Sequence, residues 1–417
     1  MTDVIRDTID RILTRVNAIG AGGPGFTRPS YSPLETEAHG VIEEEAGALG
    51  LGVTRDAGSN LFARLPGRDR AAPPLYIGSH LDTVPMGGAY DGTAGVAAAM
   101  ALVAHFVERG ETPPCDIVAT VTRAEESVWF PVSYIGSRAA LSRLTAEEME
   151  ACRADTGRTL ADHMREEGGD PDRVLAGPGL PAATFLELHI EQGPLLDTAH
   201  EPFALIEGVR GGLRYRFAAI EGVWAHSGGA PRHLRSDAVF ALADMIAGLD
   251  GDWAEMLEAG HDLAVTVGRV DAATDEHAFA KVPGRVGFCL DMRSIDPAVL
   301  DEMDRRLGRI VSRIEEARGV TFRLGPSSRS TPSALSKTLA DRLEEAAGPL
   351  GFAPRRMVSG GGHDAAAFAA AGWTSGMVFI RNWDGSHNPD EGMDPADLAD
   401  AVRCVAAAWA DAQARPA

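Results

Sequence analysis

Histidines and acids follow several apolar, strand-like runs of this chain, each inside a glycine-rich turn. They are His80, Asp91, Glu126, His189 and His387. Nitrogen and oxygen ligands at the carboxyl ends of neighbouring strands are what a metal site in an open α/β sheet requires. Three histidines, one glutamate and one aspartate that can bridge form a suitable set for two divalent ions sharing a carboxylate. The pattern therefore predicts a dinuclear metal site.

The run GSHLDTVPMGGAYDG contains the first two of these residues. Asp82 lies two residues after His80, where it can accept a hydrogen bond from the second ring nitrogen and fix the tautomer. Asp91 precedes Gly92, which permits a tight turn into the next helix. An isolated histidine is more often a core residue with satisfied hydrogen bonds, but this context favours a ligand.

Glu125 and Glu126 end another apolar run, CDIVATVTRAEE. Adjacent carboxylates repel each other unless a cation is close. One glutamate as metal ligand and the other as general base would resolve this. A base beside a metal-bound water is sufficient to hydrolyse an amide. Taken alone, such a pair more often marks an exposed acidic turn.

The later histidines have weaker local context. In FLELHIEQGP, alternation places His189 with Glu187 and Glu191 on one face of a buried strand, where they need partners. His387, in GSHNPDE, would by itself suit a solvated loop. His363, in GGGHDA, either supports the metal site or lies at the cap of the following helix.

Two residues in the middle of the chain could contact a substrate. His226 lies in a turn of small residues, AHSGGAPRHLRSDA, and Arg293 ends the run FCLDMRS. A guanidinium at a strand end can hold a carboxylate in bidentate fashion. Either residue could instead form a structural ion pair.

The elements that must position these residues alternate between strand and helix. Helices are predicted at 3–20, 34–50 and 94–109, and strands at 60–65, 75–79, 116–123 and 184–190. This alternation indicates an α/β fold with a largely parallel sheet covered on both faces. The charged stretch 145–175 is predicted to be a helical surface excursion.

The pattern changes near residue 211. Strands at 213–222, 263–270, 284–292 and 319–324 and helices at 235–249 and 297–317 follow the order βαββαβ. That order predicts a ferredoxin-like sheet with two helices on one face. A helix at 333–346 and a last strand then resume the first pattern. We therefore expect a discontinuous catalytic domain at 1–210 and 327–417, with an inserted domain at 211–326.

The composition is that of a soluble globular protein: 417 residues, 45% hydrophobic and 24% charged. The net charge of −21 argues against a nucleic acid or an anionic membrane as partner. Four cysteines without a CxxC pair suit a reducing cytosol. The first helix lacks the apolar centre of a signal peptide, and no run reaches membrane-spanning length. We expect a cytoplasmic protein.

Taken together, the motifs resemble those of the hydantoinase/carbamoylase-type amidohydrolases of the M20 metallopeptidase superfamily. This group includes N-carbamoyl-L-amino acid hydrolases, β-ureidopropionases and allantoate amidohydrolases. The resemblance spans about residues 5–410. It rests on GSHLDTVPMGG-x-x-DG, the EE pair with SYIGSRA, HIEQGP, AHSG-x-x-P-x-x-x-R-x-DA, D-x-RS, GGHDA and SHNP-x-E.

The resemblance implies a role for each site residue. His80 and His189 would bind one ion, Glu126 and His387 the other, and Asp91 would bridge them. It also implies that Glu125 is the general base, that Gln192 and Arg293 hold the ureido and carboxylate groups, and that Asp82 and His363 support the ligands. The inserted domain would be a lid and dimerisation domain, whose His226 reaches the active site of the neighbouring subunit to stabilise an oxyanion. A cis peptide is expected between Asp91 and Gly92.

Some positions depart from the family pattern. Ala280 occupies the place of a usual asparagine, for which Lys281 or His277 could compensate. Trp129 follows the acid pair, where a glycine and a basic residue are common, and Trp383 enlarges the loop before His387. These changes suggest a more apolar or aromatic substrate.

The function predicted from these residues is hydrolysis of an N-carbamoyl amino acid or related linear amide by a metal-bound hydroxide. Mixed nitrogen and oxygen ligands suit Zn, Mn, Co or Ni, and the order of affinities favours Zn over Mn. The alternatives are an N-acyl amino acid or dipeptide hydrolase on the same scaffold and, least favoured, an inactive binding protein. The protein is expected to be a homodimer that acts on a small molecule.

Overall fold

The computed structural model describes residues 3–272 and 276–410, which divide into two compact units. Unit 1 is Met1–Glu207 with Ala334–Ala417, and unit 2 is Gly208–Ser333. Both junctions fall within strands, β6 (Phe203–Val209) and β14 (Ser333–Ala334). Unit 2 is thus an insertion between two parts of unit 1.

Unit 1 is built on a nine-stranded sheet with the order β1-β2-β4-β3-β5-β16-β6-β14, with β15 also paired to β6. The four strands β4, β3, β5 and β16 are mutually parallel, whereas β1, β2 and β6 pair antiparallel at the flanks. The prediction of an α/β fold with a mostly parallel central sheet is confirmed. The remaining bounds are β1 (Gly52–Arg55), β2 (Leu61–Leu65), β3 (Leu75–His80), β4 (Ile117–Thr122), β5 (Thr184–Ile190), β15 (Arg355–Ser359) and β16 (Thr374–Ile380).

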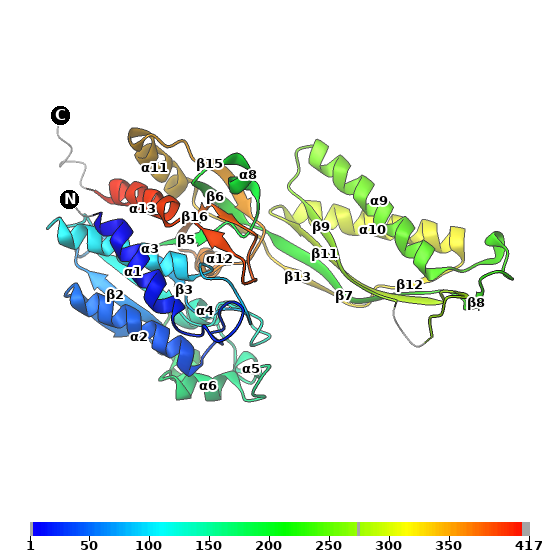
Figure 1. Ribbon diagram of the computed structural model, residues 1–417, viewed down its shortest axis with the longest axis horizontal. Coiled ribbons are helices and arrows are strands. Elements are labelled where there is room, and N and C mark those ends of the chain that lie inside the picture. Colours follow the sequence, from blue (N-terminus) through cyan, green and yellow to red (C-terminus); the bar gives the residue numbers. More distant parts are fainter. Residues whose placement is uncertain (1–2, 273–275, 411–417) are drawn as a thin grey trace. The chain divides into compact units, whose positions relative to one another are not determined.

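Helices cover both faces of this sheet (Figure 1). On one face α1, α3, α11 and α13 pack on one another and on the central strands, and α12 packs against β5 and β16 from the other. Their bounds are α1 (Val4–Asn17), α2 (Pro33–Ala48), α3 (Thr93–Glu108), α11 (Lys337–Ala347), α12 (Asp364–Ala370) and α13 (Pro395–Trp409). The shorter helices are α4 (Ile135–Ala140), α5 (Ala146–Met149), α6 (Leu160–Glu166), α7 (Pro171–Ala176) and α8 (Leu195–Ala199).

Helix α3 is central to the site because it starts directly after Asp91. Its sequence is apolar all around, which is typical of a fully buried helix, and almost every residue of it is buried. At Gly95 a Cβ atom would lie 2.2 Å from the carbonyl oxygen of Leu188. Glycine therefore lets the start of α3 approach β5 closely and brings Asp91 beside the end of that strand.

Unit 2 has the predicted βαββαβ order. Its main sheet has the order β12-β7-β11-β9, with β13 also on β7, and these strands pair antiparallel. Its elements are β7 (Gly211–Glu221), β8 (Ala225–His226), α9 (Ala238–Glu258), β9 (Ala264–Asp271), β10 (Lys281–Val282), β11 (Arg285–Ser294), α10 (Pro297–Arg318), β12 (Thr321–Arg323) and β13 (Ser327–Ser330). Helix α9 runs nine residues beyond the predicted end at 249, because Trp253 and Met256 continue its apolar stripe past two glycines.

Within the described residues, all four cysteines are free thiols. None of the described helices is both long enough and apolar enough to cross a membrane.

Candidate functional site

Two histidines reach the site from the ends of adjacent parallel strands. His80 is the last residue of β3 and His189 lies near the end of β5, and both are buried. Each ring is oriented through Nδ1, which lies 3.0 Å from the Asp82 carbonyl oxygen in His80 and 2.9 Å from the Ile190 carbonyl oxygen in His189. Both Nε2 atoms therefore face inward, 3.5 Å and 3.1 Å from Asp91 Oδ1. We call these two histidines the strand-end ligands.

The other two candidate ligands come from turns. Glu126 follows β4, and His387 lies in the loop between β17 (Asn382–Trp383) and β18 (Gly392–Met393). His387 Nε2 is 3.3 Å from both Asp91 Oδ2 and Glu126 Oε1. The His387 side chain is 51% exposed, in contrast to His80 and His189. We call Glu126 and His387 the turn ligands.

The two oxygens of Asp91 face two separate groups of donors. His80, His189 and Asp91 form one group, and Asp91, Glu126 and His387 form the other, with ligand atoms within 4.8 Å of one another in each. Neighbouring ligands of one tetrahedral Zn²⁺ lie about 3.3 Å apart, given bond lengths near 2.0–2.2 Å. The observed separations match this value, so the residues present fit two ions that share Asp91.

The turn at Asp91 differs from the sequence-based expectation. The described residues contain no cis peptide bond, so the expected cis bond between Asp91 and Gly92 is wrong. Gly92 instead adopts a left-handed φ of 63°, and the Thr93 N–H donates to the Asp91 carbonyl oxygen at 2.6 Å. Glycine allows this backbone without strain, and the turn closes with trans peptides.

Asp82 connects His80 to the acid pair. It lies beside His80, with Oδ1 at 3.3 Å from Nδ1. Its two oxygens also accept hydrogen bonds from the backbone N–H groups of Glu125 (3.0 Å) and Glu126 (3.2 Å), and Oδ2 accepts one from Ser30 Oγ. One carboxylate thus orients a ligand and anchors the turn that carries the predicted base.

Glu125 is placed to act as a base. Its Oε2 is 4.0 Å from His80 Nε2, and the side chain is buried. Burial raises the pKa of Glu125 well above its ordinary value, His80 opposes this shift, and the charge of Glu126 adds to it. A carboxylate with a raised pKa is the type that can take and return a proton near neutral pH.

The charges of the cluster favour a cation at its centre. Hydrogen bonds to Asp91 and Glu126 raise the pKa of His387 to about 11. Burial opposes protonation of His80, but its hydrogen bonds to Asp82 and Asp91 raise its pKa well above the ordinary value. Burial also disfavours ionised Asp91, yet the histidines around it hold its pKa well below the usual range. Such strongly shifted groups are typical of functional sites.

Gln192 and His363 also lie at this cluster. Gln192 Nε2 donates to Asp91 Oδ2 at 2.8 Å. The His363 ring packs edge-on against the His189 ring, with centroids 4.5 Å apart, and its Nε2 is 2.9 Å from Ser359 Oγ. Burial lowers the pKa of His363 well below its ordinary value, so it packs as a neutral ring.

A buried ion pair that no sequence pattern predicted lies behind the acid pair. Glu35 of α2 lies 3.0 Å from Arg123 Nη1, and neither side chain is exposed. Glu35 Oε1 also accepts the N–H of Ala124 at 2.9 Å. Ala124 has a left-handed φ of 52°, so Glu35 stabilises a strained turn directly before Glu125. Nothing local in the sequence of α2 indicates this contact.

His226 and Arg293 belong to unit 2 and not to the cluster in unit 1. His226, in β8, is exposed and accepts hydrogen bonds at Nδ1 from the N–H groups of Gly228 and Gly229. Arg293, in β11, donates to Asp291 Oδ2 at 2.9 Å and 2.8 Å through Nε and Nη2.

Ala280 lies beside the His226 segment, since its carbonyl oxygen accepts the Ser227 N–H. The two residues proposed to compensate for it have partners within unit 2. Lys281 donates to the Glu276 carbonyl oxygen and lies over the Trp224 ring, and His277 Nε2 is 3.0 Å from the Arg285 carbonyl oxygen.

Trp129 gives no support to the expectation of an aromatic substrate. It is 8% exposed, packs in a core cluster with Tyr31 and Phe130, and donates from Nε1 to the Thr83 carbonyl oxygen at 2.7 Å. Trp383, which is 38% exposed, packs closely on Gly392, where a Cβ would lie 2.0 Å from Trp383 Nε1.

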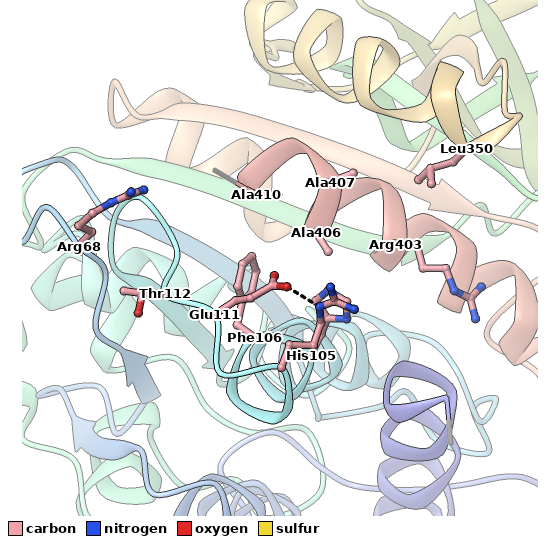
Figure 2. Close-up of a pocket in the computed structure, with 11 residues that line it drawn as sticks. Arg68, His105, Phe106, Glu111, Thr112, Leu350, Arg403, Ala406, Ala407 and Ala410 are labelled. Atoms are coloured by element: carbon pink, nitrogen blue, oxygen red, sulfur yellow. Dashed lines mark hydrogen bonds and ion pairs between the residues drawn. The ribbon is translucent and has the colours of Figure 1, made fainter. Parts of the chain in front are cut away.

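A separate cavity of about 620 Å³ lies at the far end of α3 (Figure 2). His105 and Phe106 in the last turns of α3, Arg403 in α13 and Arg68 line it. At 1.5 Å per residue, the twelve residues from Thr93 to His105 put it about 18 Å along the helix from the candidate metal ligands. It is therefore no part of the candidate metal site.

The chain is similar to several known proteins. The model of "Peptidase family M20/M25/M40" matches residues 76–411. An N-carbamoyl-L-amino-acid amidohydrolase of Paenarthrobacter aurescens is 31% identical over 397 residues, 94% of each chain. An allantoate amidohydrolase of Bacillus subtilis is 28% identical over 96% of each chain.

Among solved structures, an amidase of the hydantoinase/carbamoylase family from Burkholderia multivorans is similar, with a TM-score of 0.86 and 26% identity. The match covers 99% of this chain and 98% of that one. On these matches, the chain belongs to the M20 peptidase family, among its hydantoinase/carbamoylase-type amidohydrolases.

Proposed function

We propose that this protein is a metal-dependent amidohydrolase that cleaves a C–N bond of an N-carbamoyl (ureido) amino acid or a related linear amide. As an M20 hydrolase with relatives named amidohydrolases, it acts on carbon–nitrogen bonds. The observation that carries the proposal is Asp91, whose two oxygens face two complete donor groups next to Glu125.

The proposed cofactors are two divalent ions per chain. His80 and His189 would hold one, Glu126 and His387 the other, and Asp91 both. When bound, such ions supply Lewis-acid activation of a water and of the substrate carbonyl. Imidazole and carboxylate donors suit Zn²⁺, with Mn, Co or Ni as further candidates.

The chain's own residues would manage the proton and the substrate. Glu125 would take a proton from the attacking water on Oε2 and return it to the leaving nitrogen. Buried Asp82 would keep Glu125 in place through its backbone N–H. Gln192 and Arg293 are proposed to hold the ureido and carboxylate groups, and His226 to stabilise the oxyanion. Water and a carbamoyl amino acid would give ammonia, carbon dioxide and the free amino acid.

The test is ammonia release by the Zn- or Mn-loaded protein across N-carbamoyl amino acids, allantoate, and the matching N-acetyl and N-formyl compounds. We expect ammonia from at least one ureido compound. Amine release from an acyl compound with no ammonia from any ureido compound would instead establish the N-acyl amino acid hydrolase. A metal-loaded protein without turnover on the whole panel would contradict both.

The cellular location and the oligomeric state of the protein are also proposed. We propose a cytoplasmic homodimer, with unit 2 as the dimerisation domain; its free thiols suit a reducing compartment. Light scattering of the purified chain tests the dimer, and a monomer at micromolar concentration would contradict it.

A further inference from the structure

Glu391 makes a cluster of hydrogen bonds beside the candidate metal site. It is only 5% exposed. Its Oε1 accepts the backbone N–H groups of Tyr90 (2.8 Å) and Asp91 (3.1 Å). Its Oε2 lies 2.7 Å from Ser386 Oγ. One side chain therefore joins the turn that carries the bridging Asp91 to the loop that carries His387, segments about 300 residues apart in the sequence.

The turn and the carboxylate approach each other very closely. A Cβ atom at Gly88 would lie 2.1 Å from the Glu391 carboxyl carbon and 2.2 Å from Oε1. Only glycine leaves room at such a distance. The close contact therefore requires both Gly88 in the turn and Glu391 in the loop.

Ser386 extends this connection to the bridging side chain. Its Oγ lies 2.7 Å from Asp91 Oδ2 and 2.7 Å from Glu391 Oε2. A hydroxyl donates one proton, so it can satisfy only one of these oxygens at a time. Glu391 and Asp91 are therefore linked twice, through the backbone N–H of Asp91 and through this shared hydroxyl.

The loop of His387 needs such an anchor. Asp384 and His387 both have a left-handed φ of 60°, a conformation that costs a non-glycine residue about 1 kcal/mol or more. By contrast, His80 and His189 are fixed by their strands and by Nδ1 hydrogen bonds. Strained residues persist where surrounding contacts hold them, and Glu391 provides such contacts here.

We propose that Glu391 is a positioning residue that holds Asp91 and His387 in place for the second ion. This inference rests on the proposed metal site but not on the substrate. Residues that orient metal ligands typically change metal affinity 10–100-fold when removed. Loss of Glu391 should therefore release the ion at Asp91, Glu126 and His387, while His80 and His189 keep the other.

The experiment is to load the full-length protein with Zn²⁺, dialyse it against a weak chelator, and measure bound Zn²⁺ per chain. Wild type should keep two ions. His387→Ala removes a turn ligand outright and should keep one ion per chain. It therefore defines the result expected when the second ion is lost. Glu391→Ala should also keep one, with unchanged circular dichroism.

Two further variants make the result specific. In Glu391→Gln the amide oxygen can still accept both backbone N–H groups, and the amide nitrogen can donate to Ser386 Oγ, so two ions should remain. Asp390→Ala removes the exposed neighbouring acid and should also keep two. If Glu391→Ala does not fold, Ser386→Ala tests the same link and should weaken the second ion severalfold.

Retention of both ions by Glu391→Ala, or loss of both, would overturn the proposal, as would loss of an ion in Asp390→Ala. Because Zn²⁺ content is measured without substrate, this outcome is separate from the fate of the proposed function. If the protein binds two ions but hydrolyses no amide, the proposed reaction is contradicted while the proposed role of Glu391 stands.

Discussion

The two halves of the candidate metal centre are built in different ways. His80 and His189 end buried parallel strands and are oriented by Nδ1 contacts to backbone carbonyl oxygens. His387 lies half exposed in a loop with left-handed backbone, oriented by carboxylates and anchored by Glu391. In the strand-end half the strands themselves fix the positions of the candidate ligands. In the turn half a few side-chain contacts fix the position of His387. The halves should therefore respond differently to substitution.

The largest effect is expected at the strand-end half, where Glu125 lies beside His80. Glu125→Gln keeps the shape of the side chain but cannot take a proton. We expect kcat to fall at least about 1,000-fold, since general bases contribute roughly 10²–10⁴-fold. Bound Zn²⁺ should be unchanged. Steady-state kinetics with parallel metal analysis check this, and a variant with near-normal kcat would remove Glu125 from its role.

The next effect concerns the buried ion pair that supports Glu125. In Glu35→Gln, Arg123 remains as a buried cation without its anion, so the free energy of unfolding should fall by about 3–5 kcal/mol. The amide nitrogen that replaces Oε2 cannot accept the hydrogen bonds from Arg123 Nη1 and the Tyr31 N–H, so the turn at Ala124 loses part of its support and kcat should fall about tenfold. Urea unfolding and kinetics measure both quantities. Glu43→Gln on the same helix breaks a surface pair with Arg55 of β1 and should cost less than about 1 kcal/mol.

A double variant separates positioning from stability. Glu35→Met with Arg123→Met replaces the buried pair by apolar side chains, which often restores or increases stability. We expect stability to recover but kcat to remain low, because no acceptor is left for the Ala124 N–H. Full recovery of kcat in the double variant would show that the pair is purely structural.

In the turn half, the contribution of His387 to the stability of the metal-free protein should depend on pH. Hydrogen bonds to Asp91 and Glu126 raise the pKa of His387 to about 11 in the metal-free fold. A raised pKa means that the folded state binds the proton more tightly than the unfolded state. His387 then stabilises the metal-free protein fully below the ordinary imidazole pKa near 6.5, and this is lost as pH rises toward 11.

The measurement is the difference in Tm between wild type and His387→Ala in chelator, from pH 6 to pH 10. The difference should be largest at pH 6 and shrink steadily as pH rises. A difference that stays constant across this range would mean that contacts other than the hydrogen bonds to Asp91 and Glu126 hold His387, and would contradict its orientation by carboxylates.

Much of the candidate site could be predicted from sequence because most of its candidate ligands carry a local signal. His80, Glu126 and His189 follow apolar runs, and a strand end followed by a turn can be recognised without a structure. The motif around Asp91 and the SHNP run supplied the rest. The order of helices and strands in unit 2 was predicted for the same reason, since periodicity is local.

The parts that were missed depend on contacts between distant segments. Glu35 lies in α2 among other acids, and no local pattern shows which of them turns inward to Arg123, 88 residues away. Trp129 was expected to favour an apolar or aromatic substrate because it departs from the family pattern, yet its side chain is buried in a core cluster. The cis peptide was expected from family resemblance, and Gly92 closes the turn in another way.

The smallest expected effect tests how much freedom the His387 loop retains. Gly385 has a φ of 71°, but the nearest atom to an added Cβ is Asn388 Nδ2 at 3.9 Å. At Gly92, which has a similar φ of 63°, a Cβ would lie 2.6 Å from the His80 ring and carbonyl oxygen. Gly385→Ala therefore meets only backbone strain, about 1 kcal/mol, and should keep both ions with a slightly lower Tm. Gly92→Ala is the matched control and should lose ions because it displaces His80. Equal damage from both substitutions, measured as Zn²⁺ per chain, would show that the loop is packed as tightly as the strand ends.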